Sequence, residues 1–253
     1  MAIVLRNKFF LASALSLPAT AILVKLFLHN HPLSSFRTRT IESTETLSPT
    51  SATSFSIHNL VDPNNHLGIV DSRSIRLLKS QVGSYPVEEI LARFLKGFFG
   101  GWVFTPERLL IASLNGIGMK FIPVQFSKIK PKGPTLSSLG DFSSTELPPR
   151  HTMLWGCSFI VLDYQIISPS PTHLDDAPPS FIEIGFGDDR KRFAGLHRFE
   201  VTRSRDGGAT ICFSSFSCNP TVNKAPFPKW IFRFHLFYAQ CLFRDGIREV
   251  LST

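Results

Sequence analysis

The segment KWIFRFHLFYAQCLFRDGIREVL, residues 229–251, decides the fold that we expect for this chain. Wound as an α-helix, it places its polar and basic side chains within about one third of the circumference. These side chains are Lys229, Arg233, Gln240, Arg244 and Arg248. The apolar arc contains Ile231, Phe234, Tyr238, Ala239, Cys241, Leu242 and Phe243. We expect the basic stripe to face water. Because the apolar arc is wider than one sheet face requires, we expect part of it to face a cavity, a partner or a lipid surface.

The segments before this helix have the composition of β-strands. They are rich in Phe, Ile and Val and are separated by clusters of Pro, Gly, Ser and Asp. The predicted strands are Met119–Ser127, Met153–Ile167, Phe181–Phe186, Leu196–Ser204 and Ala209–Phe216. Between the last two, the sequence Asp206-Gly207-Gly208 predicts a hairpin turn, since glycine readily adopts positive φ. These strands are therefore expected to pair in an antiparallel sheet.

Two helices are predicted before the strands. Apolar residues repeat with helical spacing from Val87 to Phe98, with acidic residues at the start and glycines at the end. Thr105 followed by Pro106 predicts the start of a second helix that runs to about Leu114. A short strand is expected at 55–61. The sequence of residues 69–78 does not distinguish a helix from a strand. The order of elements predicts an α+β fold with an antiparallel sheet and one long C-terminal helix.

Residues 9–28, FFLASALSLPATAILVKLFL, carry one charge, on Lys25. Since about 20 apolar residues span a bilayer, they predict a transmembrane helix or an uncleaved signal anchor. A cleaved signal peptide and a mitochondrial leader stay open as alternatives, because the segment also has small residues at 19–21 and the region around it is basic and free of acids. The expected localisation is a single-pass membrane protein of the secretory pathway or of mitochondria. The expected organisation is a basic tail at 1–8, the transmembrane helix at 9–28, a Ser/Thr-rich flexible tether at 29–56 and a globular α+β domain at 57–253.

Composition narrows the class of partner. The net charge is +8, but five basic residues precede the first acidic residue, Glu42, so the body of the chain is only weakly basic. Nucleic acid is therefore not an expected partner. Twenty-four Phe against 3 Trp and 3 Tyr indicate an apolar interior or pocket with few hydrogen-bonding ring groups. The four cysteines form no C-x-x-C pair, and we expect neither a metal site nor a cofactor.

Two resemblances add to this interpretation. The succession of elements resembles the helix-grip fold of the START, Bet v 1 and polyketide-cyclase superfamily, in which a curved antiparallel sheet wraps a long C-terminal helix around a hydrophobic cavity. Residues 184–251 also resemble an uncharacterised family of small plant and bacterial proteins. That resemblance is carried by Gly185 and Gly187 as a glycine pair, by Gly195, Arg198 and Phe199 as G..RF, by Ser215, Phe216 and Ser217 as SFS, and by Gln240 in the helix. That family has no assigned reaction, so the resemblance implies none. In this sequence Leu196 and His197 replace the family's two glutamates.

Six side chains are candidate site residues. His235 and His197 are candidate catalytic residues, because histidine changes its charge near neutral pH. Arg198 is a candidate to bind a carboxylate or carbonyl oxygen, with a surface ion pair to Glu200 or Asp189 as the alternative. The expected ligand-binding set is completed by Tyr164, Phe234 and Tyr238. Core packing is the alternative for His235 and for Tyr164.

Three functions remain open at this point. The favoured one is a membrane-tethered domain that binds an apolar small molecule or lipid in a Phe-rich cavity. The second is a cyclase or isomerase of polyketide or terpenoid secondary metabolism on the same scaffold. The third is a non-catalytic, membrane-associated interaction protein whose apolar helix docks on a partner or bilayer. An enzyme needs convergent polar groups in an open cavity, whereas a binder needs an enclosed apolar one.

Overall fold

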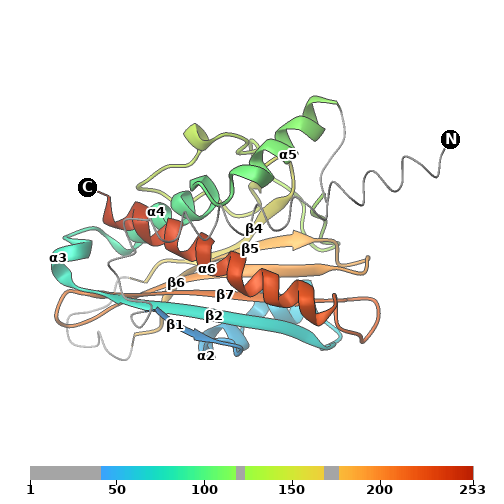
Figure 1. The fold of residues 1–253 in the computed structure, drawn as a ribbon, viewed down its shortest axis with the longest axis horizontal. Helices are drawn as coiled ribbons and strands as arrows, with labels where there is room; N and C mark the ends of the chain where they lie inside the picture. The colour runs from blue at the N-terminus through green and yellow to red at the C-terminus, as the bar shows by residue number, and fades with distance from the viewer. Residues whose placement is uncertain (1–40, 118–122, 168–176, 253) are drawn as a thin grey trace. The chain divides into compact units, whose positions relative to one another are not determined.

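The computed structural model describes residues 41–117, 123–167 and 177–252. Seven strands in this part of the chain form one antiparallel sheet in the order β1-β2-β7-β6-β5-β4-β3 (Figure 1). They are β1 (Ile41–Thr44), β2 (Gly68–Leu77), β3 (Met153–Leu154), β4 (Phe159–Gln165), β5 (Ser180–Gly187), β6 (Ala194–Arg203) and β7 (Ala209–Cys218). Strands β3 to β7 follow one another as a meander, while β2 pairs with β7. The expected α+β class and antiparallel sheet are confirmed.

Helices cover both faces of the sheet. They are α2 (Pro49–Ala52), the π-helix η3 (Ile57–Val61), α3 (Lys79–Val82), α4 (Val87–Gly100), α5 (Thr105–Gly116), the 3₁₀ turn η4 (Leu139–Asp141) and α6 (Lys229–Leu251). Figure 1 shows α4, α5 and α6 on one side of the sheet and α2 on the other. Because side chains alternate along a strand, each strand contributes to two separate interiors.

Phenylalanine fills the interior between the sheet and the long helices. The rings of Phe94 and Phe243, from α4 and α6, meet edge to face at 5.4 Å. Phe94 meets Phe199 of β6 in the same way at 5.4 Å, and Phe98 meets Phe199 at 5.0 Å. Such offset geometry is the favoured one for aromatic pairs. The expected use of phenylalanine as core material is therefore confirmed on this face.

Most of the predicted elements are present. The final helix runs over 229–251 as expected, α4 and α5 occupy the two predicted helical segments, and the ambiguous run 69–78 is strand β2. The predicted hairpin turn joins β6 to β7, with Gly207 at φ +80°. The predicted strand at 55–61 is wrong, because this segment is helical.

The long strand predicted at 153–167 is divided into β3 and β4. Trp155, Gly156 and Cys157 all have positive φ, which turns the chain and ends the first strand. The strand predicted at 119–127 lies partly outside the described residues. Within the part that is described, Gln125 makes only an isolated bridge to Asp188.

The predicted tether needs a correction, because its second half belongs to the fold. Residues 41–44 form β1, and the segment around α2 packs on the sheet, with Ser51 and Ser54 at most 4% exposed. The Ser/Thr-rich composition predicted a solvated tether, but these hydroxyl groups bind buried carboxylates on the sheet rather than water. The described domain therefore begins at Ile41 and not at residue 57.

The basic tail at 1–8 and the expected transmembrane segment at 9–28 lie outside the described residues. Among the helices of the described ranges, none combines the length and the apolar character that crossing a membrane requires.

The two faces of α6 also differ from the expectation. Arg244, assigned to a water-facing stripe, is only 6% exposed, and Gln240 accepts a hydrogen bond from Arg73 Nε at 3.0 Å. Phe234, assigned to the apolar arc, is 51% exposed. The reason is that α6 packs against both α4 and the sheet, so that its buried arc includes part of the polar stripe.

Helices α4 and α6 cross where two glycines meet. A Cβ atom on Gly97 would lie 2.9 Å from the Cα of Gly246, and a Cβ on Gly246 would lie 2.3 Å from the ring of Phe94. Real Cβ atoms do not come this close to other heavy atoms, so glycine is what allows the helices to approach. The close approach in turn places α6 over the sheet.

We expect Gly246→Ala to lower the free energy of unfolding by about 1–3 kcal/mol, the usual cost of overpacking. The added methyl group must displace the Phe94 ring, which is fully buried. Gly116→Ala is the matched control, because nothing lies within 4 Å of its Cβ position. Urea denaturation measures both variants, and equal unfolding midpoints would contradict the proposed helix contact.

Candidate functional site

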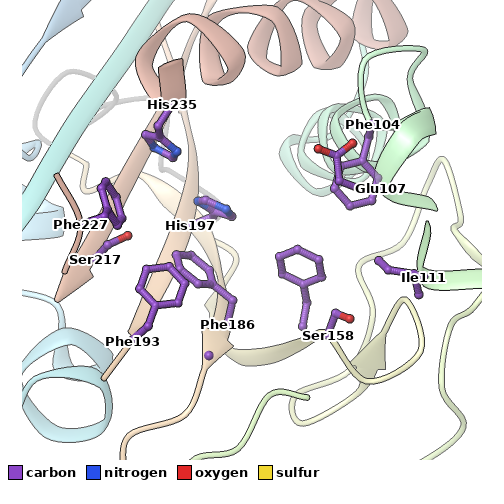
Figure 2. Close-up of a pocket in the computed structure, with 12 residues that line it drawn as sticks. Phe104, Glu107, Ile111, Ser158, Phe186, Phe193, His197, Ser217, Phe227 and His235 are labelled. Atoms are coloured by element: carbon purple, nitrogen blue, oxygen red, sulfur yellow. The ribbon is translucent and has the colours of Figure 1, made fainter. Parts of the chain in front are cut away.

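A cavity of about 200 Å³ lies between the sheet and helices α5 and α6 (Figure 2). Most of its wall is apolar. The apolar side chains that line it are Phe104, Ile111, Phe159, Phe186, Phe193 and Phe227. The polar side chains are Glu107, Ser158, His197, Ser217 and His235. A largely apolar wall with a few converging polar groups is the usual construction of a small-molecule site.

Two histidines from different elements reach this cavity. His197 lies on β6, and His235 lies on α6 above the sheet. Figure 2 shows both rings pointing into the same space, with Glu107 of α5 across from them. The structure thus brings together the two residues that the sequence marked as candidate catalytic groups.

A buried carboxylate holds His235. Asp71 of β2, Ser215 of β7 and His197 of β6 are register partners on one face of the sheet. The Nε2 atom of His235 lies 3.1 Å from the Asp71 Oδ1 atom, and Arg73 binds the other carboxylate oxygen. Burial alone raises the pKa of Asp71, but the hydrogen bond with His235 and the charge of Arg73 outweigh it, so that the pKa lies below its ordinary value.

His197 sits among phenyl rings. Its ring centroid lies 4.6 Å from that of Phe186, 5.3 Å from that of Phe213 and 5.8 Å from that of Phe98. Burial, together with repulsion from His235, lowers the pKa of His197 to about 3, and the attraction of Asp71 does not reverse this. The imidazole is therefore neutral at neutral pH. Its Nδ1 atom is enclosed and has no hydrogen-bond partner in the described part of the chain.

Glu107 is a site residue that sequence reasoning missed. Burial raises its pKa, and a hydrogen bond with Tyr238 opposes this shift without cancelling it. Its Oε2 atom has no partner among the residues that the structure describes. Acidic residues are common in the first turn of a helix, so nothing in the local sequence marks this one. Only the packing of α5 over the sheet brings it to the cavity.

The other four predicted site residues do not line this cavity. Arg198 follows His197 in the same strand and therefore points to the opposite face. There its guanidinium contacts Glu183 and Glu200, each at 2.6 Å. The Cζ atom of the guanidinium lies 3.7 Å from the centre of the Phe181 ring.

Tyr164 and Phe234 lie elsewhere on the surface. The ring of Tyr164 is 5.1 Å from the guanidinium of Arg150, and the half-exposed ring of Phe234 stacks on Tyr238 at 6.1 Å. The hydroxyl group of Tyr238 donates to the Val103 carbonyl at 3.3 Å. Its connection to the cavity is its interaction with Glu107, which lines the cavity.

The described residues define an α+β domain with an aromatic pocket between its sheet and its helices. No family model, no curated protein and no solved structure matches the chain. Both resemblances described above therefore rest on motifs and element order alone. Within the described ranges, no group of three or more His, Cys, Asp or Glu side chains is placed to hold a metal ion.

Proposed function

We propose that this domain binds a small, largely apolar ring compound that carries a polar group. The observation that carries the proposal is a Phe-lined cavity of about 200 Å³. The neutral ring of His197 and the carboxyl group of Glu107, whose pKa is raised, offer hydrogen-bonding groups to this cavity. Apolar cavities of about 150 Å³ hold one benzene ring. The volume therefore suits one ring with substituents better than an entire lipid chain.

The connectivity supports the same proposal. Helices α3 to α5 lie between β2 and β3 in the chain, β2 pairs with β7, and the chain continues from the meander into α6. This is the order of elements that the helix-grip resemblance implies, with a ligand between the sheet and the C-terminal helix. Attachment to a membrane through residues 9–28 is a further part of the proposal and rests on hydropathy.

Filling the cavity tests the proposal. We expect the full-length protein to bind phenol or cyclohexanone, and Ser217→Leu to weaken that binding at least about tenfold, because the larger side chain occupies the cavity. Ser217 is buried on β7 and lines the cavity, whereas Ser113 is exposed on α5. Ser113→Leu adds the same volume outside the site and should bind like the unmodified protein. Isothermal titration calorimetry measures all three, and equal affinities would contradict the assignment of the site.

A further inference from the structure

We infer that the cavity catalyses proton transfer at a carbon next to a carbonyl group, with His235 as the base and His197 as the hydrogen-bond donor to the carbonyl oxygen. This inference rests on the proposed function, because the carbonyl compound must first occupy the cavity. It gives residues and roles to the isomerase alternative that the sequence left open.

His235 has the arrangement of a general base. A carboxylate only accepts hydrogen bonds, so the Nε2 atom that faces Asp71 carries the proton in the neutral ring. The Nδ1 atom then keeps its lone pair, because the hydrogen bond that this ring makes to Asp71 is made by Nε2. When Nδ1 takes up a proton, the Asp71 carboxylate stabilises the imidazolium that forms. Asp71 is itself held by Arg73, which keeps the carboxylate in place.

His197 has the arrangement of a neutral donor. Enclosed N–H groups without a partner are rarer in proteins than enclosed acceptors without one, which places the proton of His197 on Nε2 and leaves Nδ1 as the acceptor. His197 lines the cavity, and its Nε2 atom is then the N–H donor of the ring. The lowered pKa of His197 keeps its ring neutral as the pH changes near neutrality.

The reaction balances without any oxidant or reductant. His235 Nδ1 takes the proton as the C–H bond breaks, the C–H electron pair forms a C=C bond, and the C=O π pair moves to the oxygen. The resulting enolate oxygen accepts the hydrogen bond from His197. The imidazolium then returns the proton to the same carbon, or to a carbon two bonds further along an unsaturated substrate. Phe186 and Phe159 line this space with apolar rings, and apolar surroundings strengthen the interaction with the enolate oxygen.

Exchange of carbon-bound hydrogen in D₂O tests this inference without knowledge of the natural substrate. The full-length protein is incubated with cyclohexanone, and the loss of the α-proton signal is followed by ¹H NMR. We expect exchange above the buffer rate, and we expect His235→Ala to reduce it at least about 100-fold, as loss of a general base does. His197→Phe should also reduce it about 100-fold, as loss of an oxyanion donor does. His58→Ala, a change at an exposed histidine of η3, is the control and should exchange like the unmodified protein.

Asp71 is a positioning residue in this scheme. Asp71→Asn should lower the maximal exchange rate and leave the KM for cyclohexanone unchanged, whereas a merely structural role would reduce both binding and exchange.

The outcomes separate the two proposals. Cyclohexanone that binds, by saturation-transfer NMR, but exchanges at the buffer rate would overturn the catalytic inference and leave the binding function intact. Exchange that survives in His235→Ala would overturn the role of that residue as the base. Absence of binding would contradict the proposed function and, with it, the inference.

Discussion

Arg198→Ala should lower the free energy of unfolding by about 3–5 kcal/mol, the usual cost of removing one partner from a buried ion pair. Arg198 is 4% exposed, and its guanidinium contacts Glu183 and Glu200 at 2.6 Å each. Both carboxylates are at most 4% exposed, so they would remain buried without a positive charge. Ser48 and Ser54 donate to these carboxylates at 2.9 Å and 2.6 Å, but hydroxyl groups do not replace the charge.

Urea denaturation of Arg198→Ala beside Arg150→Ala measures this effect. Arg150 pairs with Asp163 at the surface, with side chains 55% and 35% exposed, and loss of such a pair costs at most about 1 kcal/mol. Arg198→Lys keeps the charge but loses the forked geometry, so we expect an intermediate result and a variant that still folds. Similar unfolding midpoints for Arg198→Ala and Arg150→Ala would show that the buried network does not stabilise the fold.

His197→Phe should remove much of the loss of stability that the protein undergoes in acid. The pKa of His197 is about 3 in the folded protein and 6.5 in the unfolded chain. As the pH falls below 6.5, the unfolded chain takes up a proton that the folded protein does not, so acid favours unfolding. Each unit of pH below 6.5 lowers the free energy of unfolding by about 1.4 kcal/mol, which amounts to about 3 kcal/mol at pH 4.5.

Unfolding midpoints at pH 7.5 and pH 4.5 measure the difference. Phenylalanine suits this position because Phe98, Phe186 and Phe213 already surround the ring. Between pH 7.5 and pH 4.5, the free energy of unfolding of the unmodified protein should fall by about 3 kcal/mol more than that of His197→Phe. Parallel losses in both proteins would mean that His197 is protonated in the folded protein in spite of the phenyl rings around it.

Part of the candidate site was accessible from the sequence. His235 interrupts an apolar arc in a helix whose bounds were predicted correctly, and His197 lies near the start of a predicted strand. A histidine on an apolar face is a local signal. Asp71 and Glu107 carry no such signal, because the first lies in a run that did not distinguish helix from strand and the second is ordinary for a first helical turn.

Two of the corrected predictions, the tether and the place of Arg198, depend on contacts between distant segments. Ser and Thr at 48–54 have the composition of a flexible tether, yet they bind the carboxylates of Glu183 and Glu200, which are more than 120 residues away in the sequence. Arg198 was assigned to the cavity and lies on the opposite face, because strand alternation separates it from His197 once His197 faces inward. Hydrogen bonds and ion pairs between distant segments leave no periodic pattern in the chain.

The sequence by itself determined the elements that depend on neighbouring residues. Helical spacing and terminal glycines predict α4, apolar periodicity predicts α6, and the Asp206-Gly207-Gly208 turn predicts the pairing of β6 with β7. Only the tertiary structure decided which polar groups share the cavity and which face of α6 is buried. The contact of Gly97 with Gly246 sets the position of α6, and that position brings His235 to Asp71, 164 residues earlier in the chain. Local propensity acts over a few residues, whereas the site depends on packing between segments that the chain order keeps far apart.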